Sequence, residues 1–96
     1  MTLEERDGGL VITWLPVEQM ALLSLGLALT DEEQRVFSAL LEGQRVSLAE
    51  GALEYKKYAK TAERGVYVRC TAMERELREL GIARAPAGRL HRGAGL

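Results

Sequence analysis

The stretch Arg75-Glu76-Leu77-Arg78-Glu79-Leu80-Gly81-Ile82-Ala83-Arg84 marks the end of a helix and the start of an extended segment. An apolar series leads into it at three- and four-residue spacing, which places one apolar face along a helix; its members are Cys70, Met73, Leu77 and Leu80. Glycine directly after the last member is typical of helix C-termini. We therefore predict a helix that ends at Leu80 and a strand that begins at Ile82.

The beginning of this helix has two interpretations. Thr71 with Glu74 matches a capping box, and a start there would leave residues 65–70 as a strand. In the longer interpretation, which we favour, the helix begins near Tyr67. Arg75 and Arg78 alternate with glutamates, and for Arg78 this pattern favours a solvated helix face over a functional one.

Residues 82–92 have the pattern of a short hairpin. Two short segments, 82–85 and 89–92, flank the turn-forming sequence Pro86-Ala87-Gly88. Ile82 and Leu90 would face inward, and the arginines would face solvent. Residues 93–96 are expected to form a flexible tail.

Two further helices are predicted upstream. Thr30 with Glu33 forms a capping box, an apolar face follows over residues 36–41, and Gly43 ends that helix. The same type of signal, Ser47 with Glu50, predicts a second helix that ends near residues 64–65. Gly51 inside it would cost up to about 1 kcal/mol relative to alanine.

Residues 1–29 precede these helices as an N-terminal extension. The apolar, β-branched run from Leu10 to Leu15 predicts a buried strand, and Val17–Leu25 predicts a short helix after Pro16. The longest uninterrupted apolar part of this extension, residues 20–29, is far shorter than the roughly 20 residues of a membrane span. No membrane partner is therefore expected. We expect the extension to complete the core or to form a homodimer interface that buries Trp14.

The order helix, helix, helix and basic hairpin, from Leu29 to Arg92, resembles the winged helix-turn-helix superfamily. The resemblance is carried by the first helix after Leu29-Thr30-Asp31-Glu32-Glu33 and by the opening stretch 75–84. It implies one mainly α domain over residues 1–96, in which residues 30–92 form a three-helix core and a C-terminal β-hairpin wing, preceded by an extra strand and helix. The expected core is Val36, Phe37, Leu40, Leu48, Met73, Leu77 and Leu80.

Charge is divided unevenly along the chain. Residues 1–54 hold three basic and ten acidic side chains, a net charge of −7, whereas residues 55–96 hold ten basic and four acidic ones, a net charge of +6. The field of such a patch acts locally, because salt screens it beyond about 10 Å. The division favours a basic face with a polyanionic partner.

The resemblance implies that this partner is double-stranded DNA and that the chain is a transcription regulator. The third helix, about residues 67–80, would enter the major groove, and the wing, residues 82–92, would contact the flanking backbone. The implied base contacts are Tyr67, Arg69, Thr71 and Arg75. The implied phosphate contacts are Lys56, Lys57 and Lys60 on the second helix and Arg84, Arg89, His91 and Arg92 in the wing.

Other classes of function have little support in the residues. His91 and Cys70, the only histidine and the only cysteine, are too few for a zinc site and too far apart in sequence to indicate a nucleophile–base pair. We therefore expect no enzyme activity and no cofactor. A single cysteine without a disulfide partner fits a reducing, cytoplasmic location. The alternative function is a small winged-helix adaptor or inhibitor that binds another protein, of the kind that viruses and mobile elements encode.

Overall fold

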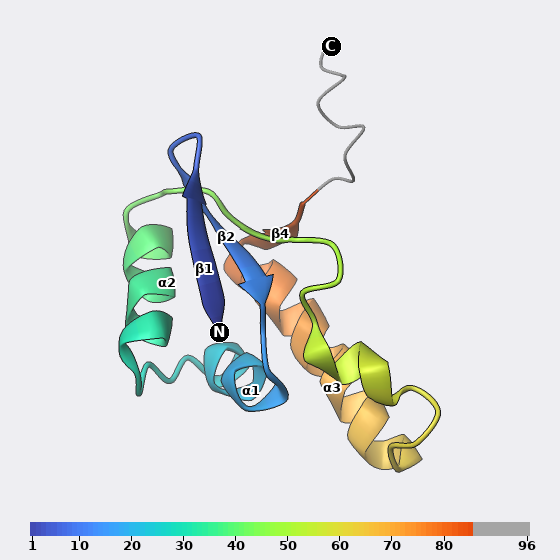
Figure 1. Cartoon of the computed structure of the whole chain (residues 1–96). Coiled ribbons are helices and arrows are strands. Elements are labelled where there is room, and N and C mark those ends of the chain that lie inside the picture. Colours follow the sequence, from blue (N-terminus) through green and yellow to red (C-terminus); the bar gives the residue numbers. More distant parts are fainter. Residues whose placement is uncertain (86–96) are drawn as a thin grey trace.

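Residues 1–85, which the computed structural model describes, form a four-stranded sheet and three α-helices (Figure 1). In chain order the elements are β1 (Thr2–Arg6), β2 (Gly9–Trp14), α1 (Val17–Leu25), α2 (Asp31–Leu41), β3 (Val46–Leu48), the short 3-10 helix η1 (Glu54–Tyr58), α3 (Arg64–Leu80) and β4 (Ile82–Arg84). Within these residues no helix is both long and apolar enough to cross a lipid bilayer.

The sheet is mixed, with the strand order β1-β2-β3-β4. β1 and β2 form an antiparallel hairpin whose turn, Asp7-Gly8, has positive φ at both residues, as a type I′ turn requires. β2 pairs with β3, and β3 with β4, in parallel. Parallel neighbours need crossover connections, which are supplied here by α1 with α2 and by η1 with α3.

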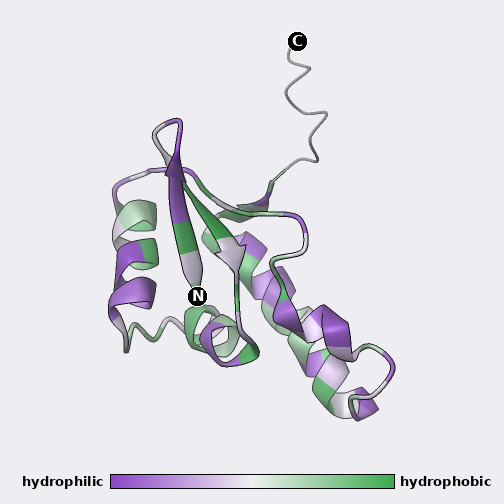
Figure 2. Ribbon diagram, viewed as in Figure 1, coloured by the Kyte–Doolittle hydropathy of each residue, from purple (hydrophilic) through white to green (hydrophobic). Residues whose placement is uncertain are grey.

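The helices pack against one face of the sheet. Side chains alternate along a strand, and the inward set contacts the helices in one apolar core; from the strands it comprises Leu10, Ile12, Val46, Leu48 and Ile82. The other row, where Val11 aligns with Ser47 and Ala83, is not part of that core. Figure 2 shows the result as hydrophobic residues along β2 and hydrophilic ones over much of α3.

Several local predictions are confirmed. The strand at residues 10–15 is β2, and the helix at Val17–Leu25 is α1. α2 begins after the Thr30 capping box, and Gly43 adopts a left-handed conformation just past its end. α3 ends at Leu80 with Gly81 as its left-handed cap, and its start at Arg64 supports the longer interpretation over a strand at 65–70.

The winged helix-turn-helix fold is wrong. Three of the four strands precede α3, and the N-terminal residues, predicted as an extension, supply β1 and the interior strand β2. Residues 82–84 do form a strand, but they pair in parallel with β3 rather than as the first arm of a hairpin. The predicted second arm, residues 89–92, lies outside the described residues.

The helix predicted from Ser47 is also wrong. Residues 46–48 are buried and form β3, because they complete the sheet between β2 and β4. Gly51 has φ +79°, a left-handed conformation that interrupts any helix through this region. Only η1, a single short helix, remains of the predicted element.

The predicted core is partly correct. Val36, Leu48 and Leu77 are buried, whereas Leu80 is 40% exposed because α3 ends at the surface. Phe37, Leu40 and Met73 are half-buried against the core. Trp14 is also only half-buried, at the end of β2, so its predicted burial is not met within the described chain.

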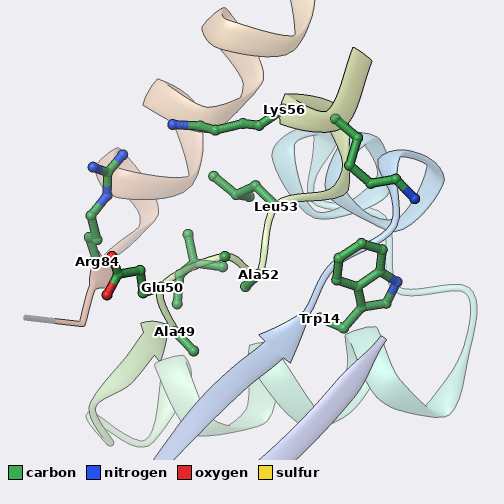
Figure 3. A pocket seen from close by; sticks show the side chains of 10 residues that line it. Trp14, Ala49, Glu50, Ala52, Leu53, Lys56 and Arg84 are labelled. Atoms are coloured by element: carbon green, nitrogen blue, oxygen red, sulfur yellow. The ribbon is translucent and has the colours of Figure 1, made fainter. Parts of the chain in front are cut away.

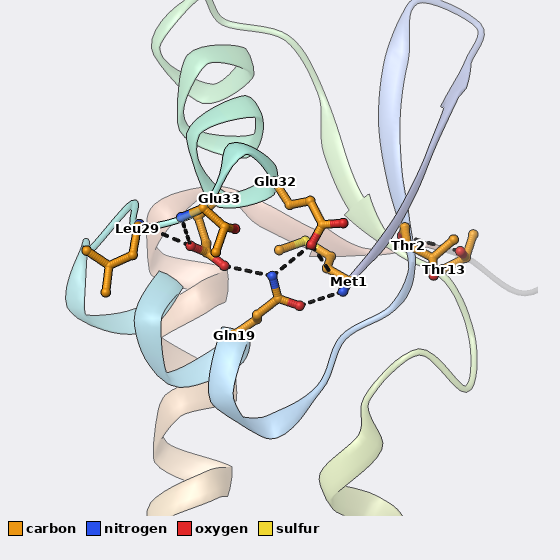
Figure 4. A network of polar contacts seen from close by, with 8 residues as sticks. Met1, Thr2, Thr13, Gln19, Leu29, Glu32 and Glu33 are labelled. Atoms are coloured by element: carbon orange, nitrogen blue, oxygen red, sulfur yellow. Dashed lines mark hydrogen bonds and ion pairs between the residues drawn. The ribbon is translucent and has the colours of Figure 1, made fainter.

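A polar network fixes the start of α2 beside α1 (Figure 4). The carboxylate of Glu33, which is fully buried, accepts hydrogen bonds from the backbone N–H groups of Leu29 and Thr30 and from Nε2 of Gln19. Gln19 also donates to Glu32, and its Oε1 accepts from the amine of Met1. Burial opposes ionisation of Glu33, but these donors outweigh it and hold the pKa of Glu33 below its usual value.

Candidate nucleic-acid interface

Three parallel strands end at the same edge of the sheet. Ile12 aligns with Leu48, and Leu48 with Arg84, so the segments that follow β2, β3 and β4 meet there. Ligands of open α/β sheets bind at this carboxyl edge, where the strands stop and loops converge. The loops at this edge are therefore the candidate ligand-binding region.

The loop after β3 is held against this edge by backbone bonds. The N–H of Leu15 donates to the carbonyl of Ala52 at 2.7 Å, and the N–H of Glu54 donates to the carbonyl of Leu15 at 3.1 Å. The side chain of Glu54 accepts from the N–H of Val17 at 2.9 Å, at the start of α1. η1 follows this loop and therefore has a fixed position. Its two lysines, Lys56 and Lys57, lie at the carboxyl edge.

A buried carboxylate organises the basic side chains of this edge. Glu74 on α3 is 7% exposed, and its oxygens accept from the Tyr55 hydroxyl at 2.5 Å and from Nη2 of Arg84 at 2.7 Å. Arg84 reaches α3 because it continues the inward-facing row of β4 after Ile82. Nζ of Lys56 and Nη1 of Arg78 each lie 3.9 Å from one of the carboxylate oxygens.

These contacts keep Glu74 ionised. Burial opposes the charged form, but the hydrogen bonds from Tyr55 and Arg84 and the charges of Lys56 and Arg84 outweigh it, so the pKa of Glu74 lies below its usual value. Burial and the hydrogen bond to Glu74 raise the pKa of Tyr55, so its hydroxyl remains a donor.

The edge carries an excess of positive charge. Lys56, Arg78 and Arg84 surround Glu74, and Lys57 lies one residue along η1. The three cations around Glu74 have side chains about half-exposed, so solvent and ligands can reach them. We call these four the carboxyl-edge cations. Glu74, together with Glu50 and Glu54 on the segment that follows β3, offsets three of these four charges, so the excess of positive charge at this edge is small.

None of the remaining predicted contacts in the described residues is bonded to Glu74. Arg69 and Arg75 are exposed on α3 but six residues apart, which separates them by about 120° around a helix of 3.6 residues per turn. Tyr67 is half-buried, with its ring centroid 5.2 Å from that of Tyr55. The hydroxyl of Thr71 donates to the carbonyl of Val68 at 2.7 Å.

Four other residues belong to the predicted set, and the structure describes one of them. Lys60 is exposed in the turn between η1 and α3, two residues beyond η1. Arg89, His91 and Arg92 lie outside the described residues. Of the predicted set, then, the structure brings together Lys56, Lys57 and Arg84.

The sequence-based hypothesis missed four residues at this edge: Trp14, Tyr55, Glu74 and Arg78. Arg78 follows Glu74 by four residues, a spacing that pairs side chains on one helix face and could have identified the contact. Trp14 ends a buried strand shortly before α1, and the ends of parallel strands are where such sheets present ligand contacts. For Tyr55 no local signal was available, because its partner is nineteen residues away.

No candidate metal site is found in the described part of the chain. Residues 1–85 contain no group of three or more His, Cys, Asp or Glu side chains arranged to hold an ion. Cys70 is buried in the core, and burial raises the pKa of its thiol.

Comparisons with known proteins found no match: no family model, no curated protein and no solved structure resembles this chain to a significant degree.

Proposed function

We propose that this protein binds nucleic acid through its phosphate backbone, using the carboxyl-edge cations. The observation that carries the proposal is the meeting of three cationic side chains from three separate elements around one carboxylate, with Lys57 next to Lys56 on η1. Lysine and arginine contacts to phosphates supply most of the sequence-independent affinity for nucleic acid. Double-stranded DNA as the target, and a role in transcription, stay predictions from the sequence.

The geometry supports phosphate contacts rather than reading of base edges by α3. Tyr67 packs against Tyr55, and Thr71 is bonded to its own helix. Lys56, Arg78 and Arg84, by contrast, share one partner: Arg84 is hydrogen-bonded to Glu74 at 2.7 Å, and Lys56 and Arg78 each lie 3.9 Å from it. A hydrogen-bonded arginine loses less side-chain freedom when a phosphate binds than a freely rotating lysine would.

The test is the salt dependence of binding to fluorescently labelled duplex and single-stranded oligonucleotides, followed by anisotropy. We expect micromolar affinity at about 50 mM salt that weakens steeply as salt rises. The double variant Lys56→Gln/Lys57→Gln should lower the salt slope by about one to two units. Arg45→Gln, which removes an exposed arginine from the loop between α2 and β3, is the matched control and should leave the slope unchanged.

Absence of binding to both oligonucleotides at micromolar protein and about 50 mM salt would show the proposal to be wrong. An unchanged salt slope in the double variant would place the phosphate contacts elsewhere on the chain, and would remove the carboxyl edge as the interface.

A protein–protein adaptor is the second candidate, and one observation favours it. Leu25 at the end of α1 and Leu27 and Leu29 on the link to α2 are 71%, 43% and 69% exposed, within the acidic half of the chain. Exposed leucines close together on a soluble surface indicate contact with another protein. If the nucleic-acid test fails, this link is the surface to examine next.

A further inference from the structure

A pocket of about 480 Å³ opens beside the carboxyl-edge cations (Figure 3). Its size falls in the range of ligand sites, about 300–1,000 Å³. Apolar and small residues form most of its surface, and charged side chains stand at its rim; the residues that line it are Trp14, Leu48, Ala49, Glu50, Gly51, Ala52, Leu53, Lys56, Lys57 and Arg84.

Trp14 gives this pocket an aromatic wall. The Nζ of Lys57 lies 5.6 Å from the centroid of the Trp14 ring, within cation–π range. A positive charge therefore lies over one face of this aromatic ring. On the opposite side, the guanidinium of Arg84 is held by Glu74, so that cation keeps its place when a ligand enters.

This combination matches the two parts of a nucleotide. Aromatic side chains stack on bases of any sequence, and lysine or arginine beside them pairs with the linking phosphate. Glu50 also lines the pocket, and its carboxylate would repel ligands with several adjacent phosphates. The fit is therefore to a base with a single phosphate, as in a nucleic-acid strand, rather than to a nucleoside triphosphate.

We infer that the pocket receives one unpaired base of a single-stranded nucleic acid, stacked on Trp14, with its phosphate beside Lys57 and Lys56. This inference rests on the proposed function. A base within a duplex has both faces covered by its neighbours, and extracting it costs a few kcal/mol. The protein should therefore prefer single strands to duplex.

Trp14 is the only tryptophan in the chain, so its fluorescence reports on the pocket directly. We expect oligothymidylate of about ten nucleotides, a length within known single-strand site sizes, to quench this fluorescence to saturation. The affinity measured by anisotropy should be about tenfold or more above that for a blunt duplex of equal length. An abasic oligonucleotide of the same length, which carries the phosphates alone, should not quench and should bind like the duplex.

Substitution of the stacking residue separates the pocket from the phosphate contacts. Trp14→Leu should weaken binding of oligothymidylate by about 5- to 100-fold and leave duplex affinity unchanged, because one base stack is lost. Trp14→Phe, which keeps an aromatic face, should restore most of the affinity. If Trp14→Leu does not fold, as judged by circular dichroism, the abasic comparison on the unaltered protein still decides.

The inference is overturned if abasic and normal oligonucleotides bind and quench alike, or if a folded Trp14→Leu variant binds single strands as well as the unaltered protein does. Quenching by thymidine monophosphate with the affinity of the oligonucleotide would instead assign the pocket to a free nucleotide and overturn the single-strand assignment. In each of these cases the protein still binds duplex and single-stranded oligonucleotides, so the proposed function stands. Loss of binding to both kinds of oligonucleotide is the separate outcome that removes the proposed function.

Discussion

The hydroxyl of Tyr55 donates a hydrogen bond to the carboxylate of Glu74, and this bond joins η1 to α3 across the carboxyl edge of the sheet. Glu74 in turn holds Arg84 on β4. Three elements that carry the basic side chains are thus fixed relative to one another by one buried carboxylate. Its removal should affect both stability and binding.

Glu74→Gln should lower the free energy of unfolding by about 1–3 kcal/mol. The amide keeps the shape of the side chain, but it cannot accept from Tyr55 and Arg84 with a full charge, and the cations around it are left uncompensated. Urea denaturation measures the change. Glu76→Gln, an exposed position on the same helix, is the control and should stay within about 0.5 kcal/mol of the unaltered protein. A variant as stable as this control would mean that Glu74 contributes no net stability.

The stabilising effect of Glu74 should depend on pH in a defined direction. Its pKa is lower in the folded protein than the ordinary value of 4.5, so ionised Glu74 stabilises the fold above pH 4.5. That contribution is lost as the pH falls through the lowered pKa. The difference in unfolding free energy between the unaltered protein and Glu74→Gln should therefore be constant at neutral pH and close below pH 4.5. A gap that widens on acidification would contradict the assigned direction.

Glu33 should be the most sensitive position of the α2 N-terminus. Glu33→Ala removes the acceptor for two backbone N–H groups and for Gln19, and we expect a loss of about 2–4 kcal/mol in thermal or urea unfolding. Asp31→Ala lies in the same first turn but is exposed, and it should cost about 1 kcal/mol or less, through the helix dipole alone. Equal effects of the two substitutions would show that the buried hydrogen bonds add nothing.

Substitution by alanine should change the stability of the protein in opposite directions at two glycines. Gly51 has φ +79°, so Gly51→Ala places a side chain in the left-handed region and should destabilise the protein by about 1–2 kcal/mol. Gly65 is helical and its Cβ would meet open space, so Gly65→Ala should stabilise α3 by up to about 1 kcal/mol. Thermal unfolding of the two variants shows whether each substitution raises or lowers the stability. Destabilisation by both would indicate that α3 does not begin at Arg64.

The homodimer predicted from the apolar N-terminal sequence remains to be tested. Leu25 and Leu29 are each about 70% exposed, and a self-association surface would cover them. Light scattering at tens of micromolar should show a dimer that Leu25→Ser/Leu29→Ser converts to a monomer. Leu41→Ser, at the far end of α2 and 87% exposed, is the control and should not change the mass. A monomeric unaltered protein would remove the dimer.

The elements that could be predicted from the sequence are those with local signals. β2, α1, α2 and α3 are each defined by an apolar run, a capping box or a terminal glycine within the element or next to it. β1 contains one apolar residue, Leu3, among charged ones, and its stability comes from pairing with β2. β3 is three residues long and depends on neighbours distant in sequence, while Ser47 and Glu50 imitate a helix start.

The residues of the candidate site also differ in how much of their role is visible in the local sequence. Lys56, Lys57 and Arg84 could be predicted as phosphate contacts, because their charge is visible without a fold. Trp14 at a strand end and the Glu74–Arg78 spacing are also visible in the sequence. That these residues share an edge with the three cations follows only from the parallel alignment of β2, β3 and β4. Three residues predicted from the sequence together with the wrong fold therefore lie at the carboxyl edge of the sheet.

The parallel pairing also means that the strands of the carboxyl edge are far apart in the chain. β1 and β2 are adjacent in the chain, and such hairpins form within about 1–10 μs. β3 and β4 can each pair only when a long intervening segment closes, at an entropic cost that the hairpin does not have. We therefore expect folding of the sheet to begin with the β1–β2 hairpin and the carboxyl edge, which needs β2, β3 and β4 together, to form later. Arg84, the second hydrogen-bond donor of Glu74, reaches its position only when β4 pairs.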